Sequence, residues 1–150
     1  MTKYNIQEKK EKDAAYRHLL SSVLVNELKE KIVNIVVKQK KYKDKNYSAK
    51  QLATDIGTNT RYISAVVNLK FQMNYSSYVN KYRIKEAMAL LKNPRYSSYS
   101  MEKISSMVGF SNRQSFYASF YKINRMSPRD YKLLQKRVRP KDAEVAEISD

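Results

Sequence analysis

Two stretches of the chain share one plan: SAKQLATDIGTNTRYISAVVN, from Ser48 to Asn68, and SMEKISSMVGFSNRQSFYASFY, from Ser100 to Tyr121. In each stretch an amphipathic segment ends at a glycine and a second amphipathic segment follows. Because glycine can adopt the positive φ that ends a helix, the second segment can start at a steep angle to the first. With one extra residue after the second glycine, the apolar positions correspond: Leu52 with Ile104, Ala53 with Ser105, Ile56 with Val108, Ile63 with Phe116, and Val67 with Phe120. The repeat predicts two helix-turn-helix units.

The rest of the sequence favours an all-α fold. The 150 residues include only two glycines and three prolines, and apolar residues recur at helical spacing almost throughout. One amphipathic helix is expected from about 27 to 41, and a long linker helix from about 75 to 92, ended by Pro94. We therefore expect two helix-turn-helix subdomains joined by the linker helix, with an N-terminal helical extension over residues 1–26 and a tail over 137–150.

Polar residues mark the expected helix starts. Serine, threonine or asparagine can cap a helix, a partner three residues later strengthens the signal, and proline suits the first helical position. The candidate caps are Ser48 with Gln51, Thr58 or Asn59, Ser100, Ser111 with Gln114, and Ser127, which precedes Pro128 and Asp130. On helical wheels the residues expected to turn inward are Ile63, Val66 and Val67 in the first unit and Phe116, Phe120 and Ile123 in the second.

The net charge predicts a polyanionic partner. The chain carries 30 Lys and Arg against 14 Asp and Glu, a net charge of +16. Residues 47–134, which hold both repeats, contain 14 basic and 4 acidic residues. Nucleic acid is the expected partner. The basic run KQKKYKDKNY, residues 38–47, is interpreted as a linker whose lysines are solvated, with phosphate contact as the alternative.

Several classes of site are excluded by composition. The chain has no cysteine and one histidine, His18, so it lacks disulfides, thiolate metal sites and the partners of a nucleophilic triad. No catalytic residue, metal or cofactor is expected. The polar N-terminus is not followed by an apolar stretch long enough for a signal peptide or membrane span. We expect a cytoplasmic, nucleoid-associated protein with no membrane partner.

Two strings in the second half then indicate a family. YSSYVNKYRIKEAMALL and GFSNRQSFYASFYKINRMSPRDYK, residues 75–91 and 109–132, resemble the DNA-binding domain of AraC/XylS-type bacterial transcription regulators. The matching positions are Arg83-Ile84, Ala87 and Leu90-Leu91 on the linker helix, Gly109-Phe110 at the turn, Phe116 and Phe120 after it, and Ser127-Pro128 near the end. The resemblance implies that residues 27–136 form this domain.

Two positions depart from the family pattern. The alanine usual after the isoleucine of the second unit is Ser105, which is still small enough for close helix packing. Arg125 stands where the family often has glycine before the Ser-Pro pair. If Arg125 keeps a left-handed conformation, it costs about 1 kcal/mol. Asn124 is the alternative residue for that turn.

The resemblance implies a sequence-specific DNA-binding regulator. The second helix of each unit would enter the major groove, and the linker helix would hold the two about one helical turn of DNA apart. The base-contacting candidates are Arg61, Ser64 and Ala65 in the first unit and Arg113, Gln114, Tyr117 and Ala118 in the second. The candidates for contacts to the DNA backbone are Asn59, Thr60, Asn68, Ser111, Asn112, Tyr121 and Lys122. For the arginines and Tyr117, phosphate contact is the alternative role, and Tyr117 could also pack at the helix edge.

The segment before residue 47 is too short for the ligand-binding barrel that such regulators commonly carry. The chain is therefore either a stand-alone regulator or the output part of a larger sensor. The stretch DAAYRHLLSSVLVNEL, residues 13–28, suits a dimerisation helix or one that packs on its own domain. RNA polymerase is a further candidate partner. The alternatives to the leading function are a non-specific nucleic-acid binder and a protein-interaction adaptor that keeps the fold.

Overall fold

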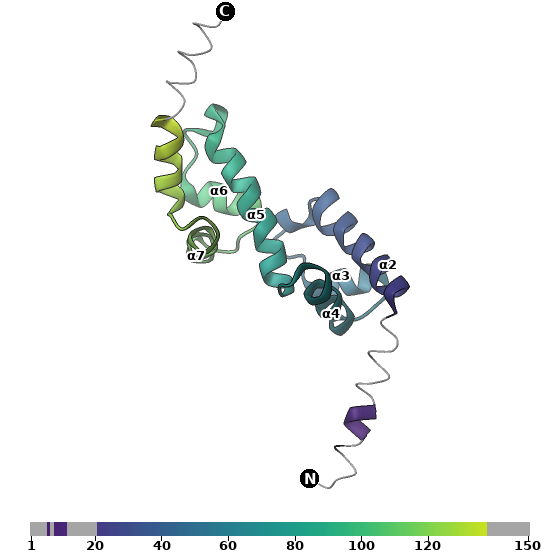
Figure 1. The fold of residues 1–150 in the computed structure, drawn as a ribbon. Helices are drawn as coiled ribbons and strands as arrows, with labels where there is room; N and C mark the ends of the chain where they lie inside the picture. The colour runs from purple at the N-terminus through teal and green to yellow at the C-terminus, as the bar shows by residue number, and fades with distance from the viewer. Residues whose placement is uncertain (1–5, 7, 12–20, 138–150) are drawn as a thin grey trace, which may run out of the picture. The chain divides into compact units, whose positions relative to one another are not determined.

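The computed structural model describes residues 6, 8–11 and 21–137, in which the regular structure is helical and there is no strand (Figure 1). The all-α prediction is confirmed for this part of the chain. The described residues fall into two compact units, and each of them contains one of the two helix-turn-helix units predicted from the sequence. The first unit includes the residues up to Gln39 and Ala49–Tyr75, and the second includes Lys40–Ser48 and the residues from Ser76 onward.

The elements follow one another along the chain with short connections. They are α2 (Ser22–Ile32), the π-helical η1 (Val33–Lys38), the 3-10 turn η2 (Lys41–Lys43), α3 (Ala49–Ile56), α4 (Thr60–Phe71), α5 (Tyr75–Lys92), the 3-10 turn η3 (Pro94–Tyr96), α6 (Met101–Val108), α7 (Arg113–Asn124) and a last helix over 128–137. The predicted linker helix corresponds to α5, with the expected bounds.

In the first unit, α2 packs against both α3 and α4, which pack against each other. The buried apolar residues of these helices and η1 are Val25, Leu28, Ile32, Val36, Leu52, Ala53, Ile63, Val66 and Val67. Burial of each valine, leucine or isoleucine side chain among them contributes about 1.5–3 kcal/mol before conformational entropy is subtracted. The predicted inward face of α4 is confirmed, because Ile63, Val66 and Val67 are its buried residues.

The helix expected from about 27 to 41 begins and ends at other residues in the structure. It begins at Ser22, where the Ser21 hydroxyl accepts a hydrogen bond from the Leu24 N–H (3.3 Å). It changes to π geometry over Val33–Lys38 and stops before Lys40, which adopts φ 57°. The apolar spacing does not reveal this change, because a four-residue step from Ile32 keeps Val36 buried.

In the second unit, α5, α6, α7 and the last helix enclose a core rich in aromatic residues. The core residues are Ile84, Ala87, Leu91, Ile104, Val108, Phe110, Phe116, Phe120 and Tyr131. The three phenylalanines pack as a series of ring contacts, with centroids 5.5 Å apart for Phe110–Phe116 and 5.9 Å for Phe116–Phe120. Ile123 was expected inward and this is wrong, because it is 47% exposed. Phe120 and Tyr131, whose rings lie 5.5 Å apart, already fill the core at that end of α7.

The basic run is only partly the solvated linker that the sequence suggested. Its lysines are exposed or half-buried, but Tyr42 within it is 6% exposed and belongs to the second unit. Residues Lys40–Ser48, called the Tyr42 segment below, therefore form part of a folded core. Tyr42 lies within a run of lysines and belongs to no helical pattern of apolar residues, so this role is seen in the tertiary structure and not in the sequence.

Candidate nucleic-acid interface

The two helix-turn-helix units, α3 with α4 and α6 with α7, have the same turn chemistry. Gly57 adopts φ 86° after α3, and Gly109 adopts φ 111° after α6. In both turns the glycine N–H and the next N–H bond back to the last helical turn, as in a Schellman motif. The Thr58 N–H donates to the Ala53 carbonyl (2.8 Å), and the Phe110 N–H donates to the Ser105 carbonyl (3.1 Å).

An asparagine caps the second helix of each unit. The Asn59 side chain accepts from the Tyr62 N–H (3.0 Å) at the start of α4. The Asn112 side chain accepts from the Ser115 N–H (2.8 Å) at the start of α7. The expectation that Ser111 caps α7 is therefore wrong by one residue, because it is Asn112 that stands in the extended conformation next to the first helical residue.

The other predicted caps can be located in the same way. The Ser100 hydroxyl accepts from the Lys103 N–H (3.1 Å), which confirms it as the cap of α6. The Ser127 hydroxyl accepts from the Asp130 N–H (3.1 Å) before the helix that starts at Pro128. Ser48 directly precedes α3, and its role as the cap of that helix stays a prediction.

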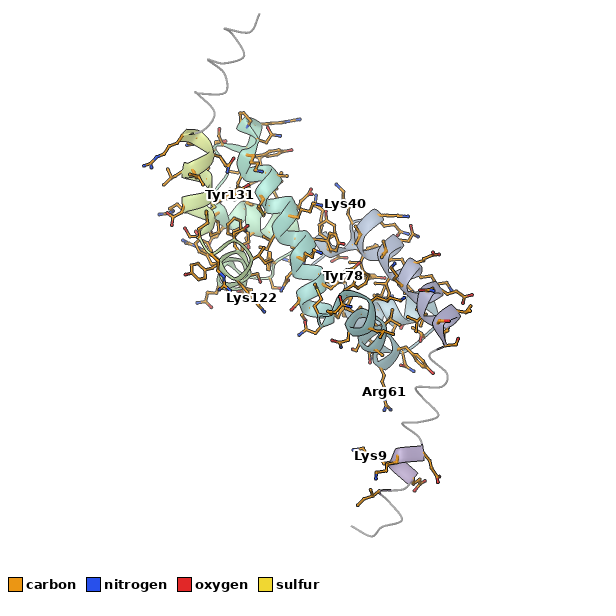
Figure 2. The ribbon with its side chains drawn as sticks, viewed as in Figure 1. Lys9, Lys40, Arg61, Tyr78, Lys122 and Tyr131 are labelled. Atoms are coloured by element: carbon orange, nitrogen blue, oxygen red, sulfur yellow. The ribbon has the colours of Figure 1, made fainter. Side chains whose placement is uncertain are left out.

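The outer face of α4 carries the candidates of the first unit. Arg61 and Ser64 are exposed, and Ala65 is half-buried. Figure 2 shows the Arg61 side chain extending away from the ribbon of α4. Of the backbone-contact candidates, Asn59, Thr60 and Asn68 are exposed, and the Asn68 side chain donates to the Ser64 carbonyl (3.0 Å). The predicted candidates of this unit therefore share the side of α4 that does not enter the core.

The outer face of α7 carries larger side chains. Arg113, Gln114 and Ala118 are exposed, whereas Tyr117 is half-buried and packs on the core. The Arg113 guanidinium lies over the Tyr117 ring, with Cζ 4.9 Å from the centroid, and Nη2 donates to the Tyr117 hydroxyl (3.4 Å). The i, i+4 spacing permits this contact but does not by itself predict it. The remaining candidates, Ser111, Asn112, Tyr121 and Lys122, are all exposed.

Neither α4 nor α7 contains an aspartate or glutamate. The four acidic residues of the region 47–134 lie on other elements, Asp55 on α3, Glu86 on α5, Glu102 on α6 and Asp130 on the last helix. The caps are asparagines rather than aspartates, which would cap equally well but add a negative charge. Both outer faces can therefore approach a polyanion without like-charge repulsion from their own helix.

The turn of the second unit is supported by the Tyr42 segment. A Cβ on Gly109 would collide with the Tyr42 carbonyl oxygen and lie 2.9 Å from the Arg83 Nε. That Nε donates to the same carbonyl (2.7 Å), and the guanidinium lies over the Phe110 ring at 5.5 Å. Arg83, known from the sequence only as a family position, is thus a packing residue of this turn. At Gly57 a Cβ would meet nothing within 4 Å.

Glu86 on α5 holds the other side of the Tyr42 segment. The Tyr42 hydroxyl donates to Glu86 Oε2 (3.3 Å), and the ammonium groups of Lys43 and Lys40 lie 3.6 and 3.9 Å from Oε1. Burial raises the pKa of Tyr42 to about 12, helped by the negative charge of Glu86 and the hydrogen bond to it. Tyr42 therefore stays protonated wherever the unit is folded at ordinary pH.

Both recognition-type helices end at a residue with positive φ that is not glycine. Gln72 ends α4 with φ 54°, and Arg125 ends α7 with φ 59°. Arg125, rather than Asn124, takes the left-handed position, so the strain considered from the sequence is present. The other departure, Ser105, is 2% exposed, and its hydroxyl donates to the Asn112 carbonyl at 3.5 Å.

A model of a helix-turn-helix domain family matches residues 52–133, more than half of the chain. The chain belongs to the AraC-type helix-turn-helix family. This is a family of DNA-binding transcriptional regulators and not of enzymes. The match covers both helix pairs, which agrees with the resemblance stated from the sequence.

Solved structures show the same fold. The C-terminal domain of the two-component response regulator yesN from Fusobacterium nucleatum is 24% identical, with a TM-score of 0.61 over 69% of this chain and 96% of that one. The C-terminal domain of AraT, a response regulator from Geobacillus stearothermophilus, is 20% identical, with a TM-score of 0.60 over 77% and 87%. An AraC-type regulator from Chromobacterium violaceum is 22% identical, with a TM-score of 0.52 over 59% and 76%. No curated protein matches the sequence.

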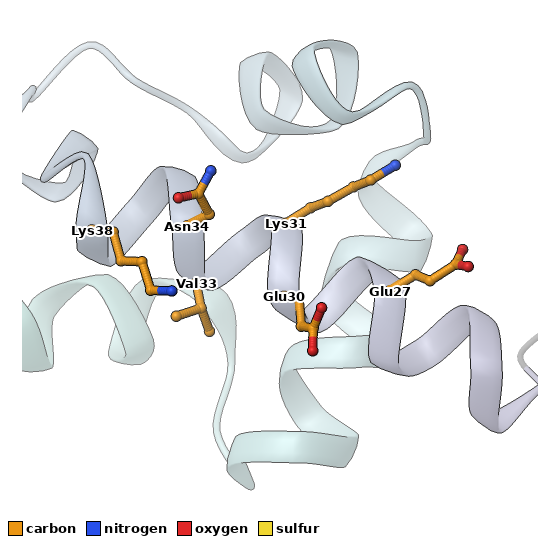
Figure 3. A pocket seen from close by; sticks show the side chains of 6 residues that line it. All are labelled: Glu27, Glu30, Lys31, Val33, Asn34 and Lys38. Atoms are coloured by element: carbon orange, nitrogen blue, oxygen red, sulfur yellow. The ribbon is translucent and has the colours of Figure 1, made fainter.

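Other kinds of site find little support in the described part of the chain. No group of three or more His, Cys, Asp or Glu there could hold a metal ion, and no helix there has the length and apolarity of a membrane span. A hollow beside α2 and η1 is lined by Glu27, Glu30, Lys31, Val33, Asn34 and Lys38 (Figure 3). Its mixed charges favour neither an anionic nor a cationic ligand. Half of the proposed dimerisation segment, residues 13–20 of 13–28, lies outside the described residues.

Proposed function

We propose that this AraC-type domain is a sequence-specific regulator that inserts α4 and α7 into successive major grooves of duplex DNA. The first helix of each pair would lie across the backbone and the second along the base edges. The alternatives, a non-specific binder or an adaptor without DNA binding, are the other outcomes of the test below.

The observation that carries the proposal is the matched design of the two outer faces. Both helices span 12 residues, both start at a neutral asparagine cap, and neither contains a carboxylate. The exposed side chains nevertheless differ between them. A surface that only needed attraction to phosphate would favour lysine and arginine throughout, whereas these faces combine single arginines with amide, hydroxyl and methyl groups, which suit base edges.

The contacts can be assigned by chemistry. Arg61 and Arg113 suit the O6 and N7 atoms of guanine, Gln114 suits adenine, and the methyl groups of Ala65 and Ala118 suit thymine. The Ser64 hydroxyl can form a hydrogen bond with either a donor or an acceptor group on a base edge. The capping and flanking residues Asn59, Thr60, Asn68, Ser111, Asn112, Tyr121 and Lys122 are assigned to phosphate and sugar contacts.

The deciding experiment is selection of binding sites from random duplexes, followed by footprinting on a selected site. We expect a site with two protected and sequence-constrained segments, centred about 10 base pairs apart, and an affinity that falls steeply with salt. Equal affinity for scrambled duplexes would assign the protein to non-specific binding. No binding at low salt would assign it to the adaptor class.

Arginine variants on the selected site test the contact assignment. Arg113→Ala should lose about 1–3 kcal/mol of binding free energy, concentrated at one base pair. Arg95→Ala, which removes the same charge from η3 outside both helix pairs, is the matched control and should have a small effect on all sequences alike. A uniform loss from Arg113→Ala would instead place Arg113 on a phosphate.

The proposal extends to cellular context. A regulator of promoters would act in the cytoplasm on nucleoid DNA, with RNA polymerase as its second partner. Pairing of two copies through the segment before α2 is a further prediction from the sequence, and sedimentation of the full chain with and without the selected duplex would test it.

A further inference from the structure

Arg113 and Tyr117 form a contact for which the first unit has no counterpart at the matching positions. The helices α4 and α7 can be aligned from their asparagine caps, so Thr60 corresponds to Arg113 and Ser64 to Tyr117. In α7 the guanidinium carbon Cζ of Arg113 lies over the Tyr117 ring, 4.9 Å from its centroid, and Nη2 donates to the ring hydroxyl (3.4 Å). Threonine and serine at the corresponding places offer no aromatic ring on which an arginine could stack.

The Tyr117 ring is itself fixed by the core. It packs edge-on against Phe116, with centroids 5.8 Å apart and an interplanar angle of 89°. Phe116 is fully buried and contacts Phe110 and Phe120. The surface arginine is therefore stacked on a side chain whose orientation the hydrophobic core determines.

We propose that Tyr117 is a positioning residue that holds the Arg113 guanidinium ready for bidentate recognition of one guanine. This inference rests on the proposed function, and it assigns Tyr117 to Arg113 rather than to a base. The contact with Tyr117 occupies one side of the guanidinium and leaves the N–H groups that do not point at the ring available. One N–H bonds to the Tyr117 hydroxyl and four remain, of which guanine O6 and N7 need two.

The expected gain in guanine preference comes from conformational entropy. An exposed arginine has many rotamers, and ordering it on binding opposes affinity. A guanidinium that is already stacked in the free protein needs less ordering. The gain applies only where the in-plane donors find two acceptors, so it should increase preference for guanine more than affinity for DNA in general.

The test measures the ratio of dissociation constants for the selected duplex and for one in which the Arg113-dependent guanine pair is replaced. Arg113→Ala should reduce this ratio by roughly 5- to 150-fold. Tyr117→Leu, which keeps an apolar side chain on the core but removes the ring, should reduce it by roughly 2- to 5-fold. Tyr117→Phe, which keeps the ring, should change it by less than about 2-fold. In the double variant Arg113→Ala with Tyr117→Leu, the ratio should equal that of Arg113→Ala alone.

A second measurement does not depend on the folding of Tyr117→Leu. In the free wild-type protein and in Tyr117→Phe, the Arg113 side-chain resonances should be shifted by the ring current of residue 117. Absence of that shift, an unchanged ratio in a folded Tyr117→Leu, or additive losses in the double variant would overturn the inference. These outcomes differ from failure of the proposed function, in which the wild-type protein selects no sequence at all.

Discussion

The two helix-turn-helix units follow the same local rules but are stabilised differently. In each, a glycine with positive φ ends the first helix, an asparagine caps a 12-residue second helix, and a left-handed residue ends it. The first unit fills its core with aliphatic side chains such as Ile63 and Val67, whereas the second uses Phe116 and Phe120. Turn geometry is thus specified locally, while the content of the core and of the outer face can vary independently.

The glycines show the difference most clearly. Gly57 is needed only for its conformation, because a side chain there would meet open space. Gly109 is needed for its conformation and also because the Tyr42 segment packs directly against its Cα. Two residues that occupy the same place in a sequence repeat can therefore be constrained to different degrees.

Alanine substitutions at the two glycines should give the largest contrast. Gly57→Ala should lower the free energy of unfolding by about 1–2 kcal/mol, the cost of a left-handed alanine. Gly109→Ala adds overpacking against the Tyr42 carbonyl, so we expect about 2–5 kcal/mol. Urea titration followed by circular dichroism measures both values. If the two variants lose equal free energy of unfolding, then the Tyr42 segment can move away from the added methyl group at no cost.

The second largest effect should appear at high pH, which should destabilise the second unit more than the first. Because the pKa of Tyr42 is about 12 when folded and near 10 when unfolded, only the unfolded state loses this proton between these values. The stabilisation is complete well below pH 10 and decreases above it, by on the order of 1 kcal/mol at pH 11. Amide exchange should show a steeper loss of protection in the second unit than in the first, and Tyr42→Phe should remove the excess. A slope that Tyr42→Phe leaves unchanged would contradict the assignment.

Replacing the asparagine cap of α4 or of α7 by aspartate tests whether both helices contact DNA. Asn59→Asp and Asn112→Asp should each preserve helix capping, since aspartate caps as well as asparagine. A new negative charge near phosphates should weaken DNA binding by about 1 kcal/mol at low salt, and by less as salt rises. Fluorescence anisotropy at several salt concentrations measures this. If only one variant weakens binding, then only that helix contacts DNA and the two-groove proposal fails.

The left-handed residues at the helix ends should give the smallest effect. Arg125→Gly should raise the free energy of unfolding by about 0.5–1 kcal/mol, because glycine removes the left-handed strain. Gln72→Gly should gain less, since it also removes the hydrogen bond from the Gln72 side chain to the Leu69 carbonyl (3.1 Å). Thermal unfolding of both variants checks the order. A larger gain in stability from Gln72→Gly than from Arg125→Gly would contradict this order.

Much of the local structure could be predicted from the sequence. The bounds of α5, the inward residues of α4 and the capping role of Ser100 follow from periodicity and side-chain chemistry. The family could also be identified, because its motifs combine several spaced positions within residues 52–133. Errors arose where two local choices were nearly equivalent, as for the cap at Ser111 or Asn112.

Other features had no local signal. Ile123 has the helical spacing of a core residue, yet it lies outside because Phe120 and Tyr131 occupy the space. The exposed faces of α4 and α7 could be listed from a helical wheel, but not the stacking of Arg113 on Tyr117, which depends on how the core orients the ring.

The two helix pairs, their glycine turns, the basic character and the family follow from the amino-acid sequence, because each of these depends on neighbouring residues or on composition. The packing of the Tyr42 segment on Gly109, where Arg83 and Glu86 hold it, is known from the folded structure alone. These contacts join residues about 40 to 70 positions apart. No pattern within a single helix specifies such a pairing, since it results from packing several elements around one core.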